Sequence, residues 1–268
     1  MAESSKPSFP SRDHRTPSSS TLGIVVFSTL RLVDPIIQHS IITRQFDLAA
    51  FLPRLLGGTI ASAPLATSLT DVFNLPTYHQ LVLSMCLGGA LKHAFWATSI
   101  SQQEMPAKHA VLIAVFNTLF NSLNTIFSIW SVTCPCNDFD EPFKSPSVVI
   151  GTVLYAVGLL TEVISEIQRK QFKQDPANAG KPYSGGLFGL ARHINYAGYL
   201  ALRTGYALAT GGPVWGLITG VFFGQAFARA SIPELDGYCQ KRVPNLCYLA
   251  DFSMEPCGPR SRKKCRIS

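Results

Sequence analysis

The sequence predicts an all-α protein, a polytopic bundle of about six to seven transmembrane helices that ends in a short helical hairpin. The 268-residue chain is 47% hydrophobic and only 15% charged, which is too apolar for an ordinary soluble domain. Several apolar stretches have about the 20 residues that a helix needs to cross a bilayer. The formal net charge of +7 fits basic loops that face the cytosol. No nucleic-acid motif is present, so we expect a lipid bilayer and no nucleic acid as partner.

The composition divides the chain into three parts. Residues 1–20 are rich in Ser and Pro and lack an apolar run, which predicts a disordered tail rather than a signal peptide. Residues 21–242 form the expected transmembrane domain, and residues 243–268 form a polar, basic tail. Seven cysteines occur without the paired spacing of a zinc site, so we expect free thiols and no metal. The close pair Cys134 and Cys136 fits a plain loop, with a metal or redox role as the alternative.

The first two apolar segments are not simple spans. Residues 22–43 are apolar except for Arg31 and Asp34, which share one face of a helix, where each charge can offset the other. Residues 46–69 are interrupted by prolines and glycines and predict a kinked or partial span.

Three clearer spans follow at residues 78–101, 109–132 and 147–166. Polar residues recur at helical spacing along one face of the second of these spans: Asn117, Asn121, Asn124 and Ser128. We expect this face to look into the bundle, because amides that face lipid lack partners. It would serve either as helix-to-helix hydrogen bonding or as the wall of a substrate cavity.

A polar, basic segment after Glu166 predicts a cytosolic loop by the positive-inside rule. Two shorter apolar segments follow it, residues 196–210 and 214–228, and the sequence Gly-Gly-Pro at 211–213 predicts a turn between them. This hairpin would return the chain to the same side as the basic loop.

Two polar stripes flank the basic segment. Tyr155, Glu162 and Glu166 share a face that continues to Arg169, and carboxylates there are costly unless they are functional or paired with Arg169 or Lys170. On the next helix, expected to begin near His193 or Asn195, the stripe consists of Arg192, Tyr196, Tyr199, Arg203 and Tyr206. Arg and His at a helix N-terminus beside glycines predict an anion site, and the deeper tyrosines could protonate a ligand.

The stretch GLFGLARHINYAGYL at 186–200 lies between EVISEIQRKQFK and ASIPELDGYCQKR. Together they resemble the C-terminal half of the membrane reductase superfamily, which includes steroid 5-alpha-reductases, sterol C14 and C7 reductases and DUF1295 proteins. That superfamily is related in fold to isoprenylcysteine carboxyl methyltransferases. The match covers residues 162–242, less than a third of the chain.

The resemblance implies an NADPH-dependent reductase of a C=C bond in a steroid, sterol or other isoprenoid or enone. Such an enzyme of lipid metabolism would lie in the endoplasmic reticulum membrane, with the cofactor site and the C-terminus in the cytosol and a lipophilic small molecule as substrate.

Carried over residue by residue, the resemblance implies that Arg192, His193, Asn195 and Tyr196 hold the cofactor phosphates and ribose. Glu162, Gln168 and Glu234 would bond its other polar groups. The family has an acidic residue after Gly198, where this chain has Tyr199. We therefore expect Tyr199, assisted by Arg203, to be the catalytic proton donor.

Other departures from the family pattern leave alternatives open. Ile194 replaces Pro, Glu166 replaces Asp, and residues 243–268 lack the aromatic and apolar ending. The final residues, Cys265–Ser268, fit a prenylation box loosely, and a solvated basic tail is the alternative. An S-adenosylmethionine-dependent membrane methyltransferase of the isoprenylcysteine carboxyl type shares the R-H-x-x-Y core, and a non-catalytic protein could keep the fold. Asn195 and Gln168 favour the reductase.

Overall fold

The computed structural model describes residues 20–45, 48–60, 74–101, 104–179, 181–235, 246–247 and 255–256. Most of the predicted tails at 1–20 and 243–268 lies outside these ranges, as do the Cys265–Ser268 motif and residues 61–69 of the second apolar segment. Apart from the paired strands β1 (Leu246–Cys247) and β2 (Glu255–Pro256), the named elements are helices.

The described helices confirm the predicted all-α membrane bundle. Five of them are long and apolar enough to cross a bilayer: α1 (Thr21–Ile42), α3 (Thr77–Phe95, continued by η3, Trp96–Ile100), α4 (Ala107–Ile129), α5 (Pro146–Gln174) and α6 (Ile194–Ala226, continued by η7, Phe227–Ser231, to Leu235). Helix α2 (Leu48–Leu55) is too short to span. Three short 3-10 turns lie in the connections: η4 (Pro142–Lys144), η5 (Pro176–Asn178) and η6 (Gly186–Gly189).

Helix α6 is the predicted hairpin. At Gly212 the backbone has φ 72° and ψ −172°, a conformation open to glycine and strained for other residues. The two arms then pack closely against each other. A Cβ added at Gly216 would lie 3.1 Å from Leu208 Cβ, and one added at Gly220 would lie 3.1 Å from Thr204 Oγ1. With the two arms counted separately, the described residues hold six candidate spans, within the predicted range.

The prediction of a loop directly after Glu166 is wrong. Helix α5 continues to Gln174 and stops before Pro176. The added residues are polar, but Gln, Arg and Lys are good helix formers and no Gly or Pro interrupts them. The helix therefore extends past the apolar span, and the loop begins about two turns later.

A seam of glycines joins α5 to the first arm of α6. A Cβ added at Gly158 would lie 2.4 Å from Leu202 N, and one at Gly198 would lie 2.8 Å from Glu162 N. Gly151 and Gly205 make the same kind of close contact about two helical turns further along the two helices. Small residues let membrane helices approach closely, so this seam fixes the start of α6 against the polar end of α5.

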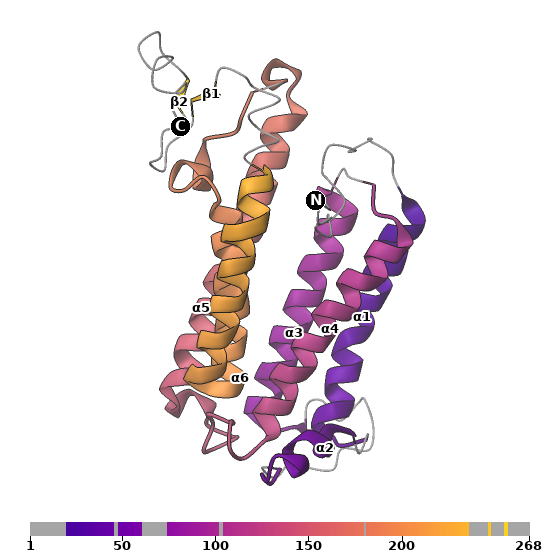
Figure 1. Cartoon of the computed structure of the whole chain (residues 1–268), viewed down its shortest axis with the longest axis vertical. Helices are drawn as coiled ribbons and strands as arrows, with labels where there is room; N and C mark the ends of the chain where they lie inside the picture. Colours follow the sequence, from indigo (N-terminus) through magenta and orange to yellow (C-terminus); the bar gives the residue numbers. More distant parts are fainter. Residues whose placement is uncertain are drawn as a thin grey trace, which may run out of the picture.

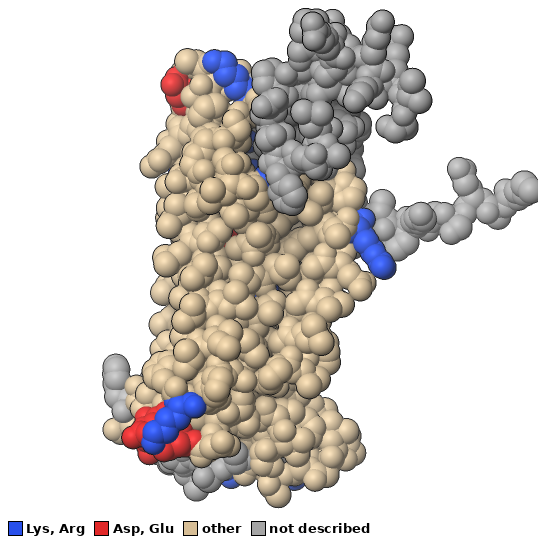
Figure 2. Space-filling model, turned by 90° about the vertical axis from the view of Figure 1, so that its left-hand side faces the viewer, with Lys and Arg blue, Asp and Glu red and all other residues tan. Residues whose placement is uncertain are grey.

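The helices form two groups, with α1, α3 and α4 beside the pair α5 and α6 (Figure 1). The start of α6 lies at the end of the bundle where α5 ends, and Lys170 donates there to Ser99 O after α3. On the face drawn in Figure 2, charged side chains gather mostly near the two ends of the molecule, with a long uncharged surface between them. That surface matches the many exposed aliphatic side chains of the spans, as a lipid-facing protein requires.

Candidate functional site

The start of α6 carries a stack of three aromatic rings. His193 is the N-cap residue of the helix, and its ring lies parallel to that of Tyr196, with centroids 5.6 Å apart and planes at 9°. Tyr196 stacks in turn on Phe227 at 4.9 Å and 3°. Phe227 comes from the returning arm, so the hairpin itself assembles this stack, which the sequence motif contains only in part.

His193 is a neutral group at pH 7. Burial, and to a smaller extent the adjacent Arg192 cation, lower its pKa from 6.5 to about 4. The positive charge of the R-H pair therefore comes from Arg192 alone. An imidazole in this state can accept or donate a hydrogen bond but adds no charge for a phosphate.

Asn195 is held by a carboxylate of α5. Its Nδ2 donates to Glu166 Oε1 at 2.9 Å, and Arg169 pairs with the other oxygen of Glu166. The expected alternative of an ion pair between Glu166 and Arg169 is therefore present. Lys170, the other candidate partner, donates to a backbone carbonyl instead.

Gln168 supports the turn before the motif. Its Oε1 accepts from Leu187 N at 2.9 Å, and Leu187 belongs to η6. A Cβ added at Gly186, where φ is +53°, would lie 2.3 Å from the same oxygen. Gly186 thus leaves room for the Gln168 side chain, whose hydrogen bond holds the turn that leads into Arg192.

Glu162 pairs with a lysine that the sequence reasoning missed. Lys92 Nζ lies 2.9 and 2.8 Å from its two carboxylate oxygens, and the lysine side chain is only 4% exposed. The same ammonium lies 4.8 Å from the ring centroid of Tyr199. A lysine inside the apolar segment 78–101 was the available signal, because ionisable residues within spans are rare and mark functional or paired sites.

Tyr199 and Arg203, the predicted catalytic pair, are in contact. Arg203 Nε donates to Tyr199 Oη at 2.9 Å, and the guanidinium lies 5.1 Å from the tyrosine ring centroid. Arg203 also donates to Asn121 Oδ1 at 3.4 Å and to Asn117 Oδ1.

The polar face of α4 does look into the bundle. Asn121 Nδ2 donates to Asp34 Oδ2 at 2.7 Å, and Trp215 Nε1 of the second α6 arm donates to Asn124 Oδ1 at 2.6 Å. With the bonds to Arg203, these amides connect α4 to α1 and to both arms of α6. The polar face of α4 therefore has one of the two expected roles, hydrogen bonding between helices.

Arg31 and Asp34 pair as expected, at 2.8 Å and almost without exposure. Asp34 also accepts from Gln38 Nε2 at 2.7 Å, and Arg31 Nε donates to His93 Nδ1 at 3.2 Å. The pair is therefore the centre of a buried polar network rather than an isolated contact.

The remaining predicted groups lie at the mouth of the hairpin. Glu234, near the end of the returning arm, is exposed, and Arg192 is half-buried beside the start of α6; each makes further interactions. No cluster of three metal-ligating side chains occurs among the described residues. Cys136 Sγ donates to Asp138 O at 3.1 Å, and burial raises the pKa of this thiol to about 11, which fits an unreactive loop cysteine.

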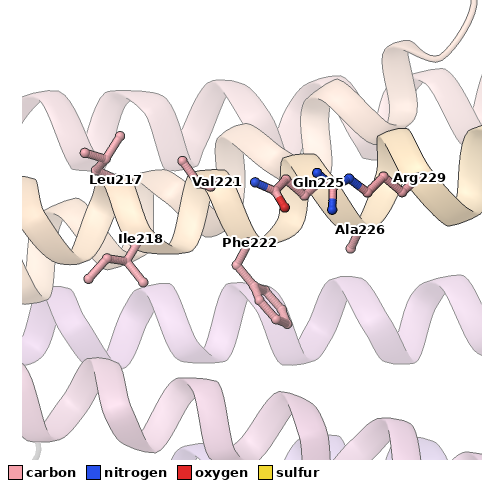
Figure 3. A pocket seen from close by; sticks show the side chains of 7 residues that line it. All are labelled: Leu217, Ile218, Val221, Phe222, Gln225, Ala226 and Arg229. Carbon is pink, nitrogen blue, oxygen red and sulfur yellow. The ribbon is translucent and has the colours of Figure 1, made fainter.

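An open apolar groove of about 640 Å³ runs along the second arm of α6. Leu217 and Ile218 lie at one end and Gln225 and Arg229 at the other, polar end (Figure 3). The Phe222 side chain points away from its own helix (Figure 3), and its ring packs on that of Phe120 in α4, with centroids 5.4 Å apart.

These features define a polytopic membrane protein with stacked aromatic rings and an arginine at the start of its hairpin. A family model described as "Protein of unknown function (DUF1295)" matches residues 95–244, more than half of the chain, and the protein belongs to this family. The chain is 34% identical over 232 residues to "Probable O-methyltransferase ustE" of Ustilaginoidea virens, covering 84% of this chain and 81% of that protein. No solved structure matches significantly.

Proposed function

We propose that the protein is an integral-membrane O-methyltransferase that uses S-adenosylmethionine and acts on a lipophilic acceptor. The observation that carries the proposal is the internal engagement of Asn195 with Glu166 and of Gln168 with Leu187. These were the two residues that favoured a reductase, and here each has a structural role that needs no nicotinamide cofactor. The similarity to a relative named as a probable O-methyltransferase, which extends over most of both chains, supports the same conclusion.

The residues at the start of α6 fit this cofactor. The stacked rings of His193, Tyr196 and Phe227 offer aromatic surface for an adenine. Arg192 would bind the methionine carboxylate, because a guanidinium matches a carboxylate in geometry and charge. Glu234 would bind the cofactor's ammonium or ribose. When bound, S-adenosylmethionine supplies a methyl group activated on a sulfonium sulfur.

The side chains deeper in the hairpin would prepare the acceptor. Tyr199 and Arg203 lie one and two turns further into the bundle than Tyr196, where they would hydrogen-bond the acceptor oxygen and orient it. The Arg203 guanidinium adds positive potential beside Tyr199, which favours the deprotonated and more nucleophilic form of that oxygen. The surrounding apolar helices would exclude water.

A second candidate, the NADPH-dependent reductase of a steroid, sterol or other isoprenoid C=C bond, is favoured by one contact. Arg203 donates to Tyr199 Oη and so leaves the phenol hydrogen available, as a proton donor requires. The neutral His193 leaves Arg192 as the cation of that R-H pair, which gives less charge for a nucleotide's phosphates than the motif alone suggested.

We further propose that the cofactor end faces the cytosol, as in an enzyme of the endoplasmic reticulum membrane. The positive-inside rule supports this orientation. Several basic residues lie at that end, among them Lys170, Lys173, Lys181 and Arg229, whereas the described residues at the other end include fewer: Arg44, Arg54 and Lys144.

Ligand-induced thermal stabilisation of the detergent-purified protein separates the candidates. A ligand at a hundred times its Kd adds about 2.7 kcal/mol to apparent stability. We expect S-adenosylmethionine to raise the melting temperature of the wild type and of Lys144→Ala, an exposed-loop control, but not of Arg192→Ala. Stabilisation by NADPH alone would support the reductase, and no response to either ligand would support a non-catalytic protein that keeps the fold.

A further inference from the structure

Two buried cations of the bundle pair with a carboxylate, and a third does not. Arg31 pairs with Asp34 at 2.8 Å and Lys92 with Glu162 at 2.8 Å. Arg203 is 3% exposed, yet among the described residues its hydrogen-bond partners are neutral: Tyr199, Asn121 and Asn117. Glu166, which is also buried, pairs with the more exposed Arg169. Among the described residues, the charge of Arg203 is therefore the one buried cation left without an anion.

Neighbouring groups do not neutralise this charge. Asp34 reaches Arg203 only through the amide of Asn121, which donates to Asp34 at 2.7 Å and accepts from Arg203 at 3.4 Å. Asp34 is already committed to Arg31 and Gln38. The rings of Tyr199 and Phe223, with centroids 5.1 and 5.3 Å from the guanidinium carbon, offer cation–π contact but no negative charge.

Hydrogen-bond donors remain at the same place. A guanidinium has five N–H groups, and the contacts to Tyr199, Asn121 and Asn117 use three of them. The Tyr199 hydroxyl accepts from Arg203, and among the described residues its own hydrogen has no acceptor. Two guanidinium donors and one phenol donor are therefore left without an acceptor among the described residues.

We propose that Arg203 and Tyr199 bind the acceptor substrate through an anionic oxygen, so that the substrate is a lipophilic acid, either a carboxylic acid or an acidic enol or phenol. A buried cation without a counter-charge is costly in a membrane interior, and a substrate anion would complete the site. This inference rests on the proposed O-methyltransferase function and names its substrate class.

The chemistry balances with the cofactor already named. The acid loses its proton to solvent before it binds, and Arg203 offsets the charge of the resulting oxyanion. The oxygen then forms a bond to the methyl carbon, and the sulfonium sulfur keeps the electron pair of the broken C–S bond. The product is a neutral ester or ether, which no longer pairs with Arg203 and is therefore released more readily than the acid.

Paired probes test the anion site without knowledge of the natural substrate. Binding of decanoate and of decanol is measured by thermal shift in the same nonionic detergent, on the wild type, Arg203→Met, Arg203→Lys and the surface control Lys144→Met. We expect the wild type and Lys144→Met to prefer decanoate by about tenfold or more, the range of a charge-assisted hydrogen bond. Arg203→Met should lose this preference, and Arg203→Lys, which keeps a cation, should retain part of it.

Two results would overturn the inference: equal responses of the wild type to decanoate and decanol, including no response to either, or a decanoate preference that survives in Arg203→Met. Binding of S-adenosylmethionine is measured on the same preparations. It should persist in Arg203→Met, which shows that the variant is folded. If the wild type prefers decanoate but does not bind S-adenosylmethionine, the proposed function is refuted while the anion site remains supported.

Discussion

Removing the charge of Asp34 should be among the most damaging single changes in the bundle. Asp34 is fully buried and accepts from Arg31, Gln38, Asn121 and Cys86. Asp34→Asn keeps the shape of the side chain but leaves the Arg31 cation without its partner. Breaking a buried ion pair from one side costs about 3–5 kcal/mol. At about 2–4 °C per kcal/mol for a chain of this class, the apparent melting temperature should fall by roughly 6–20 °C.

The assay follows thermal exposure of buried cysteine with a thiol-reactive fluorophore in detergent, because Cys86 is buried beside Asp34. Lys144→Gln is the matched control, since it breaks an exposed pair with Glu141 worth about 0–1 kcal/mol. The double variant Arg31→Met/Asp34→Leu should melt above Asp34→Asn, because it removes both charges. If Asp34→Asn and Lys144→Gln have the same apparent melting temperature, the buried network does not stabilise the bundle.

Three further predictions concern the seam, the motif and the hairpin. Gly158→Ala should lower the melting temperature and weaken cofactor binding, since its Cβ would meet Leu202 N at 2.4 Å, whereas Gly224→Ala, with its nearest contact at 3.9 Å, should be tolerated in the same melts. The pKa of His193 is about 4 in the folded protein and 6.5 in the unfolded one, so the stability that the neutral imidazole contributes is present above pH 6.5 and is lost as the pH falls toward 4. Between pH 7.5 and 4.5, the melting temperature of His193→Gln should therefore fall less than that of the wild type. Equal falls would contradict the lowered pKa. Trp215→Phe removes the bond to Asn124 and should cost about 1 kcal/mol or more, measured by urea unfolding, with no effect expected on S-adenosylmethionine affinity.

The spans and the hairpin could be predicted because lipid imposes simple rules on sequence. Long apolar runs predicted α3, α4 and α5, and Gly212 between two short runs marked the turn of α6. The end of α5 could not be placed by hydropathy, because hydropathy marks where the apolar span ends and not where the helix ends; the helix propensity of the polar residues after Glu166 carries it on to Gln174.

The candidate site was predicted in its local parts and missed in its long-range ones. Helical spacing on one segment placed Tyr199 next to Arg203, and the structure brings them together. Spacing carries no information on which helices pack together, so the pairing of Glu162 with Lys92 and the stacking of Tyr196 on Phe227 were not foreseen. The same limitation hid the partner of Asn195, which is Glu166 on α5.

Competition for radiolabelled S-adenosylmethionine on one wild-type preparation tests whether the protein holds this cofactor, which we place at the start of α6 with Arg192, His193 and Tyr196. Saturable binding that S-adenosylhomocysteine displaces and NADPH does not is the predicted result. Displacement by NADPH at comparable concentration, or the absence of saturable binding, would contradict it.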